Sequence, residues 1–131
     1  MAVAVDSSVL LDLLVPGASD QAKSVRALER ALPNGLVICE IVIAEIAPVL
    51  GEGAVEEFLA DWELQFVPCS LASAKLAGEM FRPFLLRGGK RGRVVPDFLI
   101  ATHAQLHAHA LLTRDLGYAR DYFDHLKVIE P

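Results

Sequence analysis

Four acidic residues lie next to or inside apolar segments of the chain, where burial of an unpaired charge is unfavourable. They are Asp6, Glu45, Asp97 and Asp115. Asp6 ends the run AVAV, Glu45 lies inside IVIAEIA, and Asp97 opens the run DFLIATHA. Clustered carboxylates repel one another and raise one another's pKa, so a fold that gathers them requires a cation to neutralise them.

The chemistry that these acids suggest is that of a hard divalent cation. Oxygen ligands, with no Cys or His required, favour Mg²⁺ or Mn²⁺ over Zn²⁺. Magnesium bound by carboxylates keeps several waters, and those waters supply the nucleophile in metal-assisted phosphodiester hydrolysis. Two structural alternatives stay open from the residues alone. Asp97 could be a first-turn acid stabilised by the helix dipole, and Glu45 could be a buried acid with a structural partner.

The elements that must position these acids alternate between strand and helix patterns. Strands are expected at residues 2–5, 36–38, 64–68, 110–113 and 126–130. Helices are expected at residues 7–14, 20–32, 40–50, 53–62, 71–86, 97–108 and 118–123, with Ser7 or Ser8 as the N-cap of the first. This order predicts the α/β class, with a parallel central sheet covered by helices on both faces.

In a parallel sheet of this kind, ligands bind outside the carboxyl ends of the strands. Asp6 follows the first expected strand and Asp115 follows the fourth. We therefore expect these two acids to converge on one edge of the sheet if their strands are neighbours.

The composition is that of a globular chain without a membrane span. The 131 residues fit one domain, residues 1–131, and 53% hydrophobic with 22% charged residues excludes a disordered chain. No apolar run reaches the roughly 18 to 20 residues of a transmembrane helix, and the acid-containing start lacks a basic leader region, so we expect a cytoplasmic protein. Cys39 and Cys69 have no C-x-x-C spacing and are assigned no chemical role.

Four sequence segments resemble the signature segments of PIN domains, in the subgroup of VapC-type ribonuclease toxins. They are AVDSSVLLDLL, IVIAEIA, VPDFLIATHA and LLTRDLGYARDYF. The resemblance covers the whole chain in order and spacing, and LLTRD and PDFLIA are its most specific parts. It implies a three-layer α/β/α fold, endonucleolytic cleavage of RNA with Mg²⁺ or Mn²⁺, a homodimer, and a small antitoxin of a type II toxin–antitoxin pair that blocks the site.

Carried over residue by residue, the resemblance makes Asp6, Glu45, Asp97 and Asp115 the metal-binding, catalytic acids. Thr113 and Ser7 or Ser8 would be polar residues lining the site. The sequence departs from the family at Glu40, which stands where a small hydroxyl residue is common. Either Glu40 is a fifth acid, or the choice of Glu45 is wrong by a helical turn. Asp121 is a further acid near the fourth segment.

A basic segment interrupts an otherwise acidic chain with a formal net charge of −5. Residues 80–96 contain no Asp or Glu and carry Arg82, Arg87, Lys90, Arg91 and Arg93. RNA carries one negative charge per nucleotide, so an acidic site repels its substrate unless metal and basic side chains offset the field. We expect Arg87, Lys90, Arg91 and Arg93 to contact RNA phosphates; the alternative is a solvated surface loop.

Three other functions match parts of the sequence. A receiver-like phosphoacceptor domain shares the length and sheet but requires adjacent acids after the first strand, where DSS supplies only Asp6. A non-catalytic interaction module with a PIN-like fold has no reason to keep four mutually repelling acids. His103 and His107 have the spacing of a helical zinc pair, but no third ligand is evident, which disfavours a zinc protease.

Overall fold

The computed structural model describes residues 2–89, 94–115 and 117–131. Its centre is a five-stranded parallel sheet in the order β3-β2-β1-β4-β5. The strands are β1 (Val3–Val5), β2 (Leu36–Ile38), β3 (Leu64–Phe66), β4 (Ala110–Leu112) and β5 (Val128–Ile129). The α/β class with a parallel central sheet is therefore confirmed.

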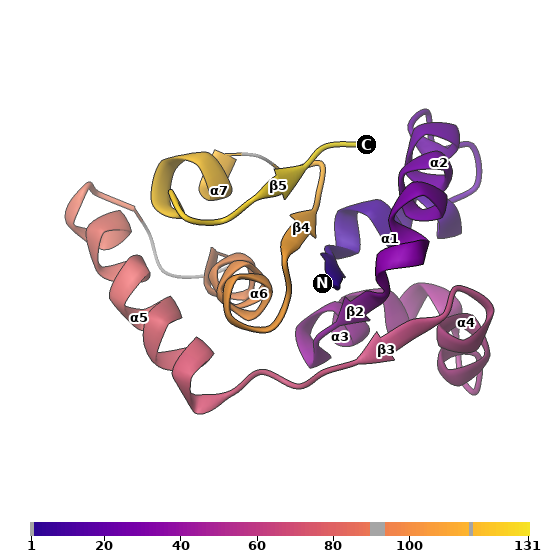
Figure 1. Ribbon diagram of the computed structural model, residues 1–131, viewed down its shortest axis with the longest axis horizontal. Helices are drawn as coiled ribbons and strands as arrows, with labels where there is room; N and C mark the ends of the chain where they lie inside the picture. The colour runs from indigo at the N-terminus through magenta and orange to yellow at the C-terminus, as the bar shows by residue number, and fades with distance from the viewer. Residues whose placement is uncertain (1, 90–93, 116) are drawn as a thin grey trace.

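Helices cover both faces of this sheet. They are α1 (Ser7–Leu14), α2 (Gln21–Ala31), α3 (Glu40–Leu50), α4 (Val55–Asp61), α5 (Leu71–Leu86), α6 (Val94–His107) and α7 (Gly117–Tyr122), with a 3₁₀ turn at Leu32–Asn34. Helices α5, α6 and α7 lie on one side of the sheet, and α1 and α2 lie on the other (Figure 1). Helix α3 packs against α1. The result is a three-layer α/β/α arrangement.

The three central strands are short apolar runs that are buried along their whole length. This is the pattern of a parallel sheet with helices on both faces, because neither face meets water. Strands β1 and β4 are direct neighbours, with Val5 opposite Leu112. Their carboxyl ends therefore lie side by side, which meets the condition for Asp6 and Asp115 to converge.

The helices that carry Asp6 and Asp97 begin differently from the sequence expectation. The N-cap of α1 is Asp6, not Ser7 or Ser8, and its side chain makes no capping hydrogen bond because the carboxylate binds side-chain hydroxyls instead. Helix α6 begins at Val94, three residues earlier than expected. Pro96 is tolerated there because the first-turn N–H groups of a helix have no intrahelical partner. Helix α3 ends, as expected, at Gly51, whose φ of 86° favours glycine.

An aromatic cluster anchors the start of α6. Phe98 is fully buried, and its ring centroid lies 5.5 Å from those of Phe81, Tyr122 and Phe123. These rings belong to or adjoin α5 and α7, so Phe98 is held from two directions. Because Asp97 is the preceding residue, this packing also fixes the position of its backbone.

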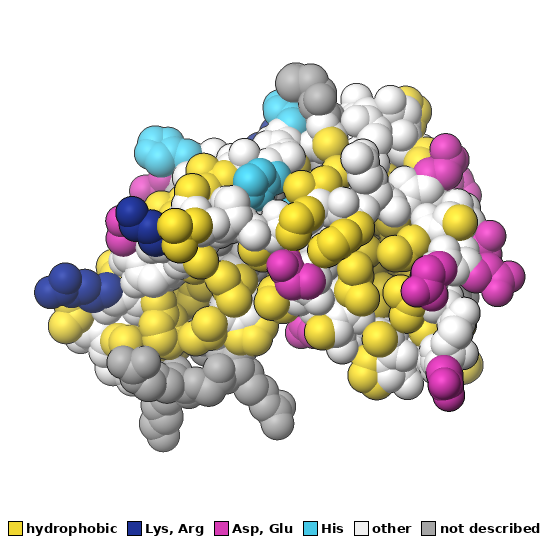
Figure 2. All heavy atoms as spheres, turned by 90° about the horizontal axis from the view of Figure 1, so that it is seen from below, with side chains coloured by type: hydrophobic (Ala, Val, Ile, Leu, Met, Phe, Trp, Pro, Cys, Tyr) yellow, Lys and Arg dark blue, Asp and Glu magenta, His cyan; other side chains and the backbone are white. Residues whose placement is uncertain are grey.

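Large apolar side chains remain exposed on the surface. They are Val15, Val49, Phe66, Leu71, Leu86, Val95 and Leu106. Figure 2 shows a broad hydrophobic surface on one face of the molecule, with acidic side chains gathered toward the α4 end. Among the described helices, none combines the length and apolar character that a bilayer span requires.

Candidate functional site

Asp6 is held where β1 and β4 end together. Its backbone N–H donates to the carbonyl of Leu112 at 2.9 Å, which continues the pairing of the two strands by one residue. Its carboxylate oxygen Oδ2 accepts hydrogen bonds from Ser8 Oγ at 2.8 Å and from Thr113 Oγ1 at 2.7 Å. The other oxygen, Oδ1, receives one long contact, from Ser7 Oγ at 3.5 Å. One oxygen of the buried Asp6 is thus fixed by hydroxyls.

Thr113 links Asp6 to Asp115. While its hydroxyl donates to Asp6, the hydroxyl oxygen accepts the backbone N–H of Asp115 at 2.9 Å. Ser8 Oγ accepts the backbone N–H of Arg114 at 3.2 Å, so the start of α1 also contacts this loop. These hydrogen bonds hold the loop after β4 against the end of β1 and the start of α1.

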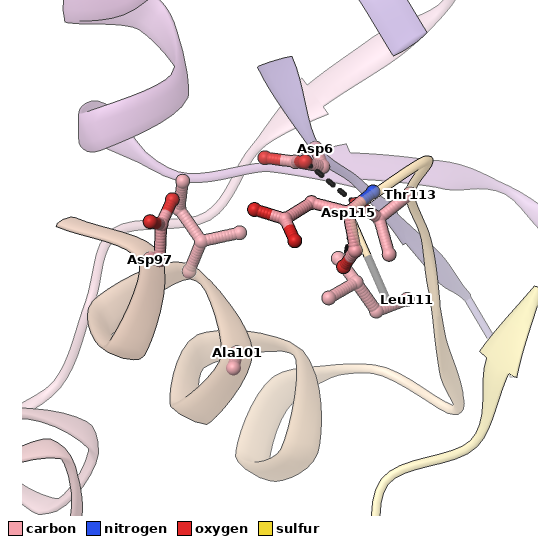
Figure 3. Close-up of a pocket in the computed structure, with 7 residues that line it drawn as sticks. Asp6, Asp97, Ala101, Leu111, Thr113 and Asp115 are labelled. Atoms are coloured by element: carbon pink, nitrogen blue, oxygen red, sulfur yellow. Dashed lines mark hydrogen bonds between the residues drawn. The ribbon is translucent and has the colours of Figure 1, made fainter. Parts of the chain in front are cut away.

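Three carboxylates face a common pocket, which is drawn in Figure 3. The pocket is lined by Asp6, Asp97, Thr113 and Asp115, with Ile100, Ala101 and Leu111 as its apolar part. The carboxylates come from the end of β1, the first turn of α6 and the loop after β4, and Figure 3 shows them gathered around the pocket. Segments distant in sequence therefore contribute to one acidic site.

Glu45 adjoins this pocket from α3. Its Oε1 accepts the Ser7 hydroxyl at 2.9 Å, and Ser7 follows Asp6 directly. The residue as a whole is exposed, but its carboxylate is turned toward Ser7. Partial burial of the carboxylate raises the pKa of Glu45, and the negative charge of Asp6 raises it further. Glu45 is not one of the residues that line the pocket itself. Its contact with the acidic pocket therefore runs through Ser7, the residue next to Asp6.

Asp97 carries the strongest sign of mutual repulsion. Partial burial, followed by the charges of Asp115, Asp6 and Glu45, raises the pKa of its carboxyl to about 6. All three of the other predicted acids therefore act on Asp97 electrostatically. Such repulsion is what a cation among the carboxylates would relieve.

The donor set fits a hard divalent cation. The polar atoms at the pocket are carboxylate and hydroxyl oxygens, the ligands that Mg²⁺ and Mn²⁺ prefer. Within the described part of the chain, no three of these carboxylates form a group whose oxygens all lie within 4.8 Å of one another, as expected for side chains of like charge. Binding of a small octahedral ion would therefore include water ligands as well as carboxylates.

Arg114 is a positioning residue that the sequence analysis missed. Its Nε and Nη2 bind the two carboxylate oxygens of the buried Asp12 at 2.6 and 2.7 Å, and its Nη1 contacts Asp20 at 3.2 Å. Ser24 Oγ donates to the same Asp12 carboxylate at 2.6 Å. Because Arg114 stands between Thr113 and Asp115, this ion pair ties the site loop to α1. Asp12 among leucines was the available signal, but its partner lies 102 residues away.

The other described residues singled out in the sequence do not line the acidic pocket. Glu40 begins α3 and accepts the backbone N–H of Cys69 at 2.9 Å, away from the residues of the pocket. Asp121 is exposed on α7 and does not line the pocket. The ring nitrogens Nε2 of His103 and His107 contact Val67 O at 2.7 Å and Ser70 Oγ at 2.9 Å. Both histidines thus have structural partners.

Of the four basic residues expected at the RNA, Arg87 is described. Its guanidinium carbon lies 5.3 Å from the centroid of the Tyr122 ring, in a cation–π contact. Lys90, Arg91 and Arg93 lie outside the described residues. The expected phosphate contacts therefore remain a prediction.

Solved structures with the same fold include complexes of toxins. VapBC2 from Rickettsia felis, bound to a DNA fragment from its promoter, matches with a TM-score of 0.76 and 19% identity over 100% of this chain and 99% of that chain. A toxin–antitoxin complex from Klebsiella pneumoniae matches with a TM-score of 0.70 and 22% identity over 98% and 96% of the two chains.

A third structure is that of a loop-cleaving toxin. Mycobacterium tuberculosis VapC20, a sarcin-ricin loop cleaving toxin, matches with a TM-score of 0.64 and 16% identity over 96% of this chain and 99% of that chain. At these identities the likeness establishes a common fold. A search of curated protein sequences finds no significant match. The sequence nevertheless matches the PIN domain family over residues 3–123, nearly its whole length. On that match, and with the three-layer fold around its acidic pocket, the chain belongs to the PIN domain family.

Proposed function

We propose that this chain is a single-domain, divalent-metal-dependent endoribonuclease and the toxin of a type II toxin–antitoxin pair. The observation that carries the proposal is the convergence of Asp6, Asp97 and Asp115 on one pocket, with Glu45 beside it. A site built only to stabilise the fold has no use for carboxylates that raise one another's pKa. The solved relatives described as toxins or toxin–antitoxin complexes agree with this reading.

Each acid has a distinct part in holding the cation. Asp6 Oδ1 is the freer oxygen of its carboxylate, because Ser8 and Thr113 occupy Oδ2. Asp97 and Asp115 face it across the pocket, and Glu45 adds charge from α3. Mg²⁺ or Mn²⁺ bound there would supply an activated water for attack on a phosphodiester and would offset charge on the transferring phosphoryl group.

The protein's own residues keep this arrangement ready for substrate. Thr113 positions Asp6 and Asp115 through one hydroxyl, and Arg114 secures the same loop to Asp12. The side chains of Ile100 and Leu111 give the pocket an apolar part beside its carboxylates. Such preorganisation reduces the rearrangement that is needed when charge develops in the transition state.

The test of this function is cleavage of defined RNAs by the purified protein. We expect internal cuts in structured RNA with Mg²⁺ or Mn²⁺ present, no cuts in EDTA, and no cuts by the Asp6→Asn variant in either condition. RNA that stays intact with every divalent ion, although the protein is folded, would instead favour the non-catalytic interaction module.

The partner part of the proposal rests on the exposed apolar side chains. Apolar side chains that gather on one face mark a protein–protein contact, so we expect a second copy and an antitoxin to cover part of this surface. A basic side chain of the antitoxin would enter the acidic pocket and replace the cation's charge. Sedimentation should show a homodimer, and co-expression with the protein of an adjacent gene should yield a complex that no longer cleaves RNA. A monomer that binds no such protein would contradict this part.

A further inference from the structure

A second group of potential metal ligands lies at the same edge of the sheet, beside β2 and β3. Cys39 follows β2, Glu40 begins α3, and Cys69 lies three residues after β3. Strands β2 and β3 are neighbours, with Ile38 opposite Phe66. The two sulfur atoms and a Glu40 carboxylate oxygen all lie within 4.8 Å of one another. None of these three residues lines the acidic pocket.

The backbone holds these ligands in place. The N–H of Cys69 donates to Glu40 Oε1 at 2.9 Å, which keeps the carboxylate beside the second thiol. The N–H of Val67 donates to Ile38 O at 2.9 Å, so the segment that leads to Cys69 follows the end of β2. The carbonyl of Val67 is in turn held by His103 Nε2 at 2.7 Å. The ligands are thus preorganised by the sheet and by α6.

The dimensions of the cluster suit a tetrahedral ion. With zinc–sulfur bonds of about 2.3 Å and zinc–oxygen bonds of about 2.0 to 2.2 Å, tetrahedral ligands lie roughly 3.5 to 3.8 Å apart. A group already within 4.8 Å requires shifts of about 1 Å to reach these separations. Cys39 is buried, Cys69 is half-buried and Glu40 is exposed, so an ion can enter from the side of Glu40.

The charges are also favourable. Two thiolates and one carboxylate around a divalent cation leave one net negative charge, and Cys39 is the N-cap residue of the 11-residue helix α3. The positive end of a helix dipole stabilises negative charge at that position. Burial raises the pKa of both thiols, so both are protonated in the metal-free protein, and a bound ion would have to displace their protons.

We propose that Cys39, Glu40 and Cys69 form a second metal site, which binds a thiophilic divalent cation such as Zn²⁺ and leaves a fourth position open to water. This site is separate from the proposed magnesium site, because thiolates select zinc-like ions while carboxylates and water suit magnesium. Helix α3 connects the two, since it carries Glu40 at its start and Glu45 further along.

Cobalt spectroscopy tests this site directly, because the chain contains only two cysteines. Co²⁺ added to the reduced full-length protein should produce a thiolate-to-cobalt charge-transfer band, and one equivalent of Zn²⁺ should abolish it. The Asp97→Asn variant, altered only in the acidic pocket, should give the same band as the wild type. Absence of the band at saturating Co²⁺ would overturn the proposal.

The Glu40→Gln variant tests the oxygen ligand without depending on a buried substitution. The amide oxygen of Gln can still accept the N–H of Cys69, so the fold should persist while Zn²⁺ affinity, measured by competition with Co²⁺, falls about tenfold or more. Glu57→Gln, an exposed acid on α4, is the matched control and should bind like the wild type. Cys69→Ser should weaken both the band and the affinity. Equal zinc affinity in Glu40→Gln and Glu57→Gln would contradict the site as proposed.

Discussion

At the scale of single residues, the main property of the acidic pocket is that its carboxylates repel one another. The pKa of Asp97 is raised to about 6 by burial and then by three acids from different elements. The ordinary pKa of an Asp side chain is about 3.9, so the folded state holds a proton on Asp97 more tightly than the unfolded state does. The stability that this protonation gives is complete below about pH 4 and is lost as the pH rises through about 6.

Replacing Asp97 by Asn should therefore stabilise the metal-free protein at neutral pH. The variant lacks the charge that the other acids repel, so its free energy of unfolding in EDTA should exceed that of the wild type at about pH 7.5 but not at about pH 4.5. The gain should be at most about 3 kcal/mol and smaller to the extent that water screens the pocket. Urea unfolding at both pH values measures it.

Asp61→Asn, an exposed acid at the end of α4, should give no comparable dependence on pH. RNA cleavage should be lost in Asp97→Asn although the protein is more stable. If the variant unfolds more easily at both pH values, Asp97 is a structural residue.

Glu45 is tested by a neutral isostere. Glu45→Gln keeps a side-chain oxygen for the Ser7 hydroxyl but removes the charge that acts on Asp97. We expect RNA cleavage to fall about 10- to 100-fold and to require more Mg²⁺, by analogy with other losses of groups around a metal site. Glu52→Gln, an exposed acid just beyond α3, is the control. Cleavage kinetics over a range of Mg²⁺ concentrations measure both effects, and unchanged kinetics would remove Glu45 from the site.

At the scale of elements, the site depends on the contact between α1 and the loop after β4. The Arg114–Asp12 ion pair is bidentate, and Asp12 is buried, so this contact is stronger than a surface salt bridge. Arg114→Lys should destabilise the protein by about 2 kcal/mol, because a single ammonium group cannot bind both carboxylate oxygens in the fork geometry.

A double-mutant cycle checks whether this loss belongs to the ion pair. Asp12→Asn combined with Arg114→Lys should cost less than the two single substitutions added together, because both remove the same interaction. The cycle requires urea unfolding of four proteins. Strict additivity would show that Arg114 and Asp12 contribute separately, so that their ion pair does not hold the loop after β4 to α1.

Patterns within the sequence were sufficient to predict the main elements. Short apolar runs such as LVI and ALL could be recognised as buried strands, and their alternation with helices predicted the parallel sheet. Asp6 and Asp115 could be brought together because parallel strands end at a common edge. Pairing of Asp12 with Arg114, and of Cys39 with Cys69, depends on which elements are neighbours in space. A single sequence does not contain that information, so both contacts were missed.

At the scale of the whole molecule, the distribution of charge should govern substrate binding. The protein has a net charge of −5, and its basic segment is local. Substituting Gln at the four basic positions Arg87, Lys90, Arg91 and Arg93 should weaken RNA binding and lower its dependence on salt. Each lost phosphate contact with single-stranded RNA changes the log–log slope by about 0.7.

Chemistry at saturating RNA should stay nearly unchanged in the same protein, because the acids of the pocket are intact. Titrations at several salt concentrations give the slope, and single-turnover cleavage gives the rate. A slope equal to that of the wild type would make the segment a solvated loop, and the path of the RNA would lie elsewhere on the surface.

The central claim is that the acidic pocket holds the divalent cation, and binding of Mn²⁺ measures this directly. Electron paramagnetic resonance of free Mn²⁺ during titration should reveal a saturable site in the wild type, lost or much weakened in Asp6→Asn, Asp97→Asn and Asp115→Asn. The same site should persist in the Asp61→Asn control, and Mg²⁺ should compete for it. Mn²⁺ binding that is equally tight in the three pocket variants and the wild type would contradict the account, because the cation would then be held by other residues.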